Sequence, residues 1–138
     1  MRRVLFLGAL VLGSVVPGAA AAGTSSWSDE ANRVCVVYTA KAKREFATPV
    51  TVSGLYAFAV KAKALENQEL AELASIPGAT PAGTKAIGSL RADVAEIDAA
   101  IRAWDKGDKA SFARILKQYL NDSRPKAAFA AAGAGRCG

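Results

Sequence analysis

The sequence contains no histidine, and this absence narrows the chemistry that the protein can perform. Ser-His and Cys-His nucleophile pairs are excluded, because both depend on an imidazole base. A transition-metal site would have to be built from two thiolates and carboxylates, which is a poor ligand set without imidazole. We therefore expect no metal ion, no cofactor and no histidine-dependent catalytic site.

Aromatic residues make up only 7% of the chain, and the excess of positive charge is modest. Removal of Arg2 and Arg3 with the N-terminal segment described below lowers the formal net charge from +6 to +4. An excess this small and dispersed does not predict a nucleic-acid partner. The abundance of alanine, with few β-branched residues outside short stretches, favours helix over sheet.

The N-terminal segment has the anatomy of a secretory signal peptide. Two arginines at 2–3 precede an uncharged apolar run at 4–16, which a Pro-Gly break and a series of alanines follow. We expect cleavage after Ala21 or Ala22, so that 1–22 is the signal peptide and 23–138 is a single helical domain that is secreted or held at the cell envelope. An uncleaved membrane anchor is the alternative, and the early Pro-Gly break and polar residues disfavour it.

Turn residues divide the mature chain into amphipathic helical blocks. The expected start signals are Ser28, Thr80-Pro81, Asp108 and Ser123, and the expected stops are Thr48-Pro49, Ile76-Pro77-Gly78, Gly107 and Asn121-Asp122-Ser123. Residues 50–60 alternate as a strand would, but no second strand could pair with them, so we predict a helix there. The predicted fold is all-α: an antiparallel four-helix bundle with a short C-terminal helix, closed by one disulfide.

The third and fourth blocks carry the clearest apolar stripes. In the third block the residues expected to face the core are Ile87, Leu90, Val94, Ile97, Ile101 and Trp104. In the fourth block they are Phe112, Ile115, Leu116, Tyr119 and Leu120. Stripes of this kind form a core far more often than they form a cofactor site.

The two cysteines lie far apart, at Cys35 in the first block and Cys137 beside the C-terminus. An isolated pair in an exported protein is normally oxidised, which predicts a disulfide between them. In the chain-entropy model, closing about 100 residues contributes about 4.7 kcal/mol of stability, less any strain in the bond. A redox-active or metal-binding pair is the alternative.

The segment Ala31-Asn32-Arg33-Val34-Cys35, together with the C-terminal Cys137-Gly138, resembles the two ends of a group of small secreted helical proteins of actinobacterial type. In that group an Ala-Asn-x-x-Cys start is similarly followed by a proline-closed first helix and by a cysteine close to the C-terminus. The resemblance implies the helical fold and the disulfide. It implies no activity, because none is established for the group.

Two clusters of charge are candidate sites. Glu66, Glu69 and Glu72 recur every three residues, with Asp93 and Glu96 as candidate neighbours. Paired carboxylates can perform acid/base chemistry, but we expect a solvated acidic face. Basic residues of the first two blocks could form a patch for an anionic surface, with a scattered solvated surface as the alternative. These basic residues are Arg33, Lys41, Arg44, Lys61 and Lys63.

By elimination, the predicted function is that of a non-catalytic, secreted or envelope-associated binding or structural module. The partners we expect are an anionic envelope polymer, a lipid surface or another extracytoplasmic protein, and not nucleic acid. A carboxylate-based extracellular hydrolase is the alternative. A pocket with converging carboxylates would favour the hydrolase, an apolar cavity would favour a small ligand, and a flat basic face would favour a polyanion.

Overall fold

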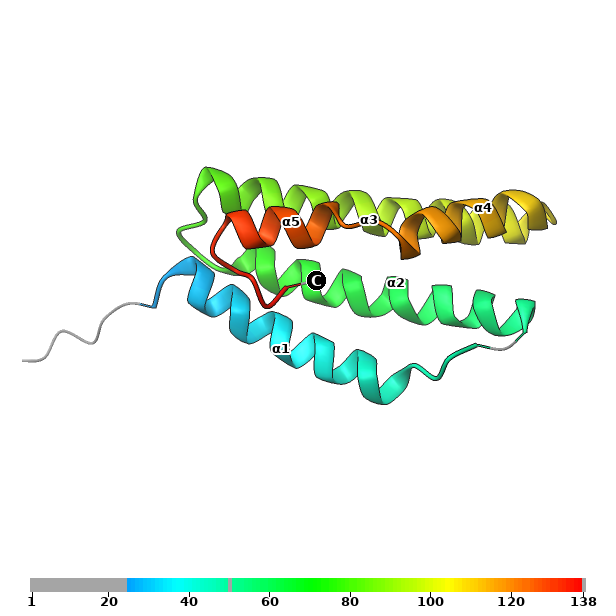
Figure 1. Ribbon diagram of the computed structural model, residues 1–138, viewed down its shortest axis with the longest axis horizontal. Helices are drawn as coiled ribbons and strands as arrows, with labels where there is room; N and C mark the ends of the chain where they lie inside the picture. The colour runs from blue at the N-terminus through cyan, green and yellow to red at the C-terminus, as the bar shows by residue number, and fades with distance from the viewer. Residues whose placement is uncertain (1–24, 50, 138) are drawn as a thin grey trace, which may run out of the picture.

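The computed structural model describes residues 25–49 and 51–137, and five helices account for most of them (Figure 1). The helices are α1 (Trp27–Glu45), α2 (Val52–Ser75), α3 (Pro81–Asp105), α4 (Lys109–Leu120) and α5 (Arg124–Ala131). No strand occurs in this part of the chain, so the all-α prediction is confirmed. The predicted signal peptide and its cleavage site lie outside the described residues.

Successive helices from α1 to α4 run in opposite directions, and α5 continues in the direction of α4 (Figure 1). The chain passes along α1, returns along α2, and runs back along α3. Then α4 and α5 follow one another along α3 and together fill the fourth position of the bundle. The predicted bundle with a short last helix is therefore present, and the break between α4 and α5 falls beside the middle of α3.

Polar residues start the helices, but the cap of α1 lies two residues earlier than expected, and the predicted Ser123 at the start of α5 makes no side-chain capping bond. Ser26 rather than Ser28 is the N-cap: its Oγ accepts a hydrogen bond from the Asp29 backbone N at 3.2 Å, and Asp29 Oδ2 accepts one from Ser26 N at 3.3 Å. This reciprocal capping box requires an acid three residues after the cap, which Ser26 has and Ser28 lacks. Thr80 and Asp108 cap α3 and α4 as predicted.

The apolar side chains form two separate clusters rather than one continuous core. The disulfide-end cluster contains Trp27, Ala31, Cys35, Leu73, Ala86, Ile87, Leu90, Phe129, Ala134 and Cys137. The far-end cluster contains Ala59, Ala62, Ile97, Ala100, Phe112 and Leu116. Both α2 and α3 contribute to both clusters, so the residues between the clusters on these helices lie at the middle of the bundle.

Most stripe residues face the core, and the exceptions have local causes. Ile87, Leu90 and Ile97 are buried, whereas Val94 is only half-buried. The prediction that Leu120 faces the core is wrong, because its side chain is 54% exposed. Leu120 is the last residue of α4, where the chain leaves the helix to reach α5.

The predicted disulfide between Cys35 and Cys137 is present and ties the segment after α5 back onto α1 (Figure 1). Asn32 strengthens this attachment: its Oδ1 accepts a hydrogen bond from Arg136 N at 2.9 Å, and its Nδ2 donates one to Gly133 O at 3.3 Å. Asn32 and Cys35 are three residues apart and share a helix face. The Ala-Asn-x-x-Cys segment is thus the docking site of the C-terminal segment.

A helix that crosses a bilayer needs about 20 predominantly apolar residues. None of the described helices is both long enough and apolar enough for this.

Candidate functional site

Three carboxylates occupy core positions in the helices that form the middle of the bundle. On α2 the inward stripe is Ala59, Ala62, Glu66, Glu69 and Leu73, and on α3 it is Ala86, Leu90, Asp93, Ile97 and Ala100. Both stripes alternate spacings of three and four residues, which keeps every member on one helix face. The acidic residues therefore separate the disulfide-end cluster from the far-end cluster.

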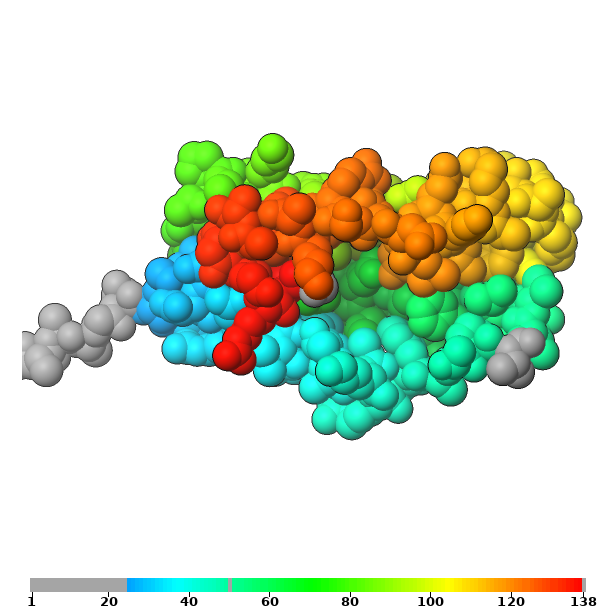
Figure 2. Space-filling view, in the orientation of Figure 1, coloured from blue at the N-terminus to red at the C-terminus, as the bar shows by residue number. Residues whose placement is uncertain are grey.

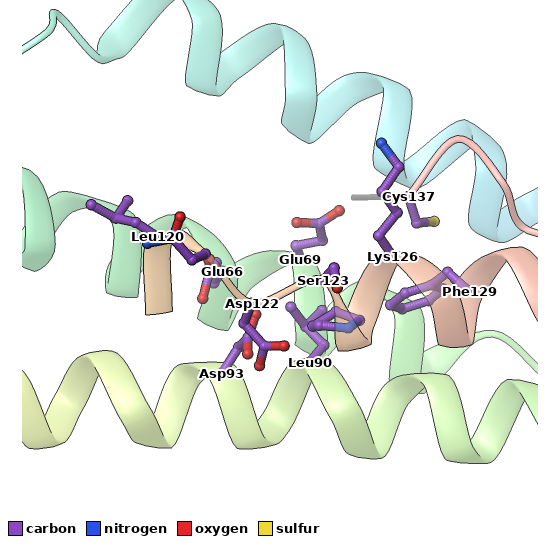
Figure 3. Close-up of a pocket in the computed structure, with 12 residues that line it drawn as sticks. Glu66, Glu69, Leu90, Asp93, Leu120, Asp122, Ser123, Lys126, Phe129 and Cys137 are labelled. Atoms are coloured by element: carbon purple, nitrogen blue, oxygen red, sulfur yellow. The ribbon is translucent and has the colours of Figure 1, made fainter. Parts of the chain in front are cut away.

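A pocket of about 390 Å³ opens at this acidic layer (Figure 3). Its walls come from α2, α3, the connection between α4 and α5, α5 itself and the C-terminal segment. The lining residues are Glu66, Glu69, Leu90, Asp93, Leu120, Asn121, Asp122, Ser123, Pro125, Lys126, Phe129 and Cys137. In the space-filling view the surface is hollowed between the α4–α5 side and α1, with α2 (green) at the floor (Figure 2).

Asp93 is the most buried acid of the pocket, with only 8% of its surface exposed. Its Oδ1 atom is buried without a hydrogen-bond partner. Burial, helped by the neighbouring carboxylate of Asp122, raises the pKa of Asp93 to about 7. Near neutral pH, Asp93 therefore exchanges between a neutral acid and a buried carboxylate.

The two glutamates from α2 have different surroundings. Glu66 accepts a hydrogen bond on Oε1 from the Tyr119 hydroxyl of α4, while its buried Oε2 has no partner. Burial raises the pKa of Glu66, and the Tyr119 bond partly offsets that effect. Burial together with the nearby charge of Glu66 raises the pKa of Glu69 to about 7. Two acids of the pocket, Glu69 and Asp93, thus titrate near neutral pH.

Arg124 pairs with two further acids beside Asp93, namely Asp122 and Glu96. Its Nε donates to both carboxylate oxygens of Asp122, at 2.9 and 2.7 Å, and its Nη2 lies 2.5 Å from Asp122 Oδ2 and 3.6 Å from Glu96 Oε2. These bonds hold the pKa of Asp122 at about 2. Asp122 is therefore a fixed, fully paired carboxylate, unlike the neighbouring Asp93.

The prediction of a solvated acidic face is wrong for the acids that line the pocket. Asp93 is buried, and Glu66 and Glu69 are half-buried, whereas Glu72 is exposed as expected. The sequence did contain a signal: Asp93 lies three residues after Leu90 and four before Ile97, on the core stripe itself. The adjacent apolar Val94 obscured that signal, because it fits the stripe almost as well.

Three carboxylates lie close enough together to bind a metal ion. One oxygen each from Asp93, Glu96 and Asp122 falls within 4.8 Å of the others. Oxygen ligands of this kind suit Ca²⁺ or Mg²⁺. However, Arg124 already holds both oxygens of Asp122 and approaches Glu96, so a cationic side chain satisfies most of this set.

The basic residues named from the sequence do not all lie together. Lys41 of α1 and Lys61 of α2 line one groove, with Glu45 and Gln68 beside them. Arg33 instead pairs with Glu30 on its own helix, and Lys63 pairs with Asp98 of α3. Arg44 is exposed. A patch for an anionic surface would thus centre on the Lys41–Lys61 groove, and it stays a prediction.

Comparisons of the chain with known protein families, with curated proteins and with solved structures give no match in any of the three.

Proposed function

We propose that the protein is a non-catalytic binding module that acts outside the cytoplasm, secreted or held at the cell envelope, and that the acidic pocket is its ligand site. A disulfide fits an oxidising compartment, where such bonds persist. The signal-peptide anatomy and the resemblance to small secreted proteins of actinobacterial type support the same location. As the partner of this module, a small ligand thus takes precedence over the lipid surface, envelope polymer or protein expected from the sequence.

One observation carries the choice of site: buried and half-buried acids line the same pocket as apolar side chains. The acids are Glu66, Glu69 and Asp93, and the apolar wall includes Leu90 and Phe129. Ligand sites commonly combine a mainly apolar lining with a few polar groups that orient the ligand, in volumes of roughly 300 to 1,000 Å³. A pocket of about 390 Å³ falls in that range.

A carboxylate-based hydrolase is the second candidate, and the Asp93–Asp122 pair favours it. The two carboxylates are neighbours whose pKa values lie near 7 and near 2. Adjacent acids with separated pKa values can divide the roles of general acid and general base. Against this reading, Arg124 binds both Asp122 oxygens, so the Asp122 carboxylate is not free to act as the base.

Native mass spectrometry of protein purified from its own host's medium tests the proposed function. We expect a co-purifying small molecule on the wild-type protein and none on Ser123→Trp, which fills the pocket. Ser123 makes no side-chain capping bond at the start of α5, so its replacement removes no cap. Ala130→Trp, on the exposed side of α5, is the matched control and should retain the ligand.

Two results would contradict the proposal. Equal ligand occupancy on the wild-type protein and Ser123→Trp, or none on either, would remove the pocket as the ligand site. Reproducible hydrolytic turnover that Asp93→Asn abolishes would replace the binding module with the hydrolase.

A further inference from the structure

The pocket contains buried carboxylate oxygens that no described residue satisfies. Asp93 Oδ1 and Glu66 Oε2 are both buried without a hydrogen-bond donor. A buried carboxylate without partners is costly, on the order of 1–3 kcal/mol for an unpaired polar group and more for a charged one. Such groups are satisfied when a donor or a cation binds beside them.

The two cationic side chains near the pocket, Arg124 and Lys126, do not pair with Asp93 or Glu66. Arg124 pairs with Asp122 and Glu96. Lys126 lines the pocket, but its ammonium points away from Asp93 and Asp122 in Figure 3. Glu66, Glu69 and Asp93 line the pocket together, and none of them forms an ion pair with a described cationic side chain.

The rest of the pocket favours an organic cation over a bare metal ion. Leu90, Pro125 and Phe129 supply an apolar wall next to the acids, and Leu120 lies at the rim. A single ion would leave most of about 390 Å³ unfilled. The three carboxylates grouped closely enough for a metal include Asp122, whose oxygens Arg124 already holds.

We propose that the ligand is a small organic ammonium compound, with its cationic nitrogen between Asp93, Glu66 and Glu69 and its apolar group against Leu90 and Phe129. This inference rests on the proposed function and names the chemical class of the ligand. The cation supplies the donors that Asp93 Oδ1 and Glu66 Oε2 lack.

Isothermal titration calorimetry with n-hexylammonium chloride tests the ligand class, with n-hexanoate, n-hexanol and CaCl₂ as comparison probes. We expect n-hexylammonium to bind at pH 7.5 and the anion to be rejected. Asp93→Asn should weaken binding about tenfold or more, the usual effect of losing a charged hydrogen-bond partner. Glu45→Gln, which removes one negative charge from an exposed position outside the pocket, is the matched control and should change affinity by less than about twofold.

Two further measurements report on charge rather than on folding. Lys126→Gln should strengthen n-hexylammonium binding by about twofold, because it removes a positive charge from the lining. Lowering the pH from 7.5 to 5.5 should weaken binding to the wild-type protein about tenfold, since the cation must then displace a proton from the pocket. The titratable and charged groups that face Asp93 are Glu66 and Glu69 of α2, Glu96 of α3, Tyr119 of α4, Asp122 of the connection and Arg124 of α5.

The outcomes separate this inference from the proposed function. If n-hexanol or n-hexanoate binds as tightly as n-hexylammonium and Ser123→Trp blocks both, the ligand class is wrong while the pocket remains the ligand site. Calcium binding that requires Asp93, without n-hexylammonium binding, replaces the organic cation with a metal ion. If no probe binds and native mass spectrometry finds no ligand, both proposals fail.

Discussion

At the residue scale, Asp93 is the unusual feature of the molecule. It occupies a core position between Leu90 and Ile97, yet it carries an ionisable group. Apolar side chains at such positions stabilise a bundle, whereas a buried acid lowers its stability when ionised. A costly residue in the core is characteristic of functional sites rather than of packing.

The raised pKa of Asp93 gives the stability of the protein a definite pH dependence. An acid whose folded pKa is about 7 contributes stability below about pH 4, and that contribution is lost as the pH rises through 7. Glu69, with a pKa of about 7, acts in the same direction, while the opposite effect of Asp122 is confined to pH values below about 4. We therefore expect the wild-type melting temperature to fall between pH 5 and pH 8.

Asp93→Asn should remove a large part of that fall. Each unit of pKa corresponds to about 1.4 kcal/mol, so the variant should melt at least about 4 °C above the wild type at pH 8 and much closer to it at pH 5. Differential scanning calorimetry at the two pH values measures this. Glu45→Gln is the control for the loss of one negative charge, and an Asp93→Asn difference that is equal at both pH values would contradict the assignment.

At the element scale, the approach of α3 to α1 depends on a missing side chain. A Cβ at Gly83 would lie 3.0 Å from Cε3 and from Cζ3 of Trp27. Trp27 is 5% exposed and stacks on Phe129 with ring centroids 6.5 Å apart, so it has little room to move. Gly83 thus leaves the space that the Trp27 ring of α1 occupies against α3 at the disulfide end.

Two glycine substitutions on α3 should therefore have opposite effects. Gly83→Ala should lower the free energy of unfolding by about 1–3 kcal/mol, as overpacking typically does. Gly88→Ala should raise it by about 0.5–1 kcal/mol, because a Cβ there meets nothing within 4 Å and alanine favours helix. Urea unfolding of both variants measures the pair, and a stabilising effect at Gly83 would show that the α1–α3 contact can relax.

At the scale of the whole molecule, the disulfide joins the two ends of the domain and also completes the pocket. Cys137 lines the pocket and is 2% exposed, and its bond to Cys35 holds the segment after α5 against α1. The attachment of this segment therefore bears on global stability and on the shape of the ligand site.

Replacing both cysteines by alanine should lower stability strongly. The bond spans a sequence separation of 102, and removal of a native disulfide from a small domain typically costs about 2–5 kcal/mol. We expect a fall of more than about 10 °C in melting temperature, measured by circular dichroism. Reduced wild-type protein should show a similar fall, and two free thiols in unreduced mature protein would disprove the bond in solution.

The sequence by itself determined the local structure, because those signals act within a few residues. Thr80 and Asp108 cap their helices through backbone groups three residues away. Proline ends a helix through its fixed φ, and glycine does so because it adopts a positive φ freely. The disulfide was also predictable, since only two cysteines were available to pair. The capping-box pattern, with Asp29 as its acid, would also have placed the α1 cap at Ser26.

Only the tertiary structure decided the site. Asp93 and Val94 both fit the apolar spacing of α3, and the packing of α2, α4 and α5 selects Asp93 as the buried residue. Glu66, Asp93 and Asp122 come from three segments that meet because α2 and α3 are antiparallel and the α4–α5 break falls beside them. Sequence spacing sets which face of a helix a residue occupies, whereas the register between helices determines which faces meet.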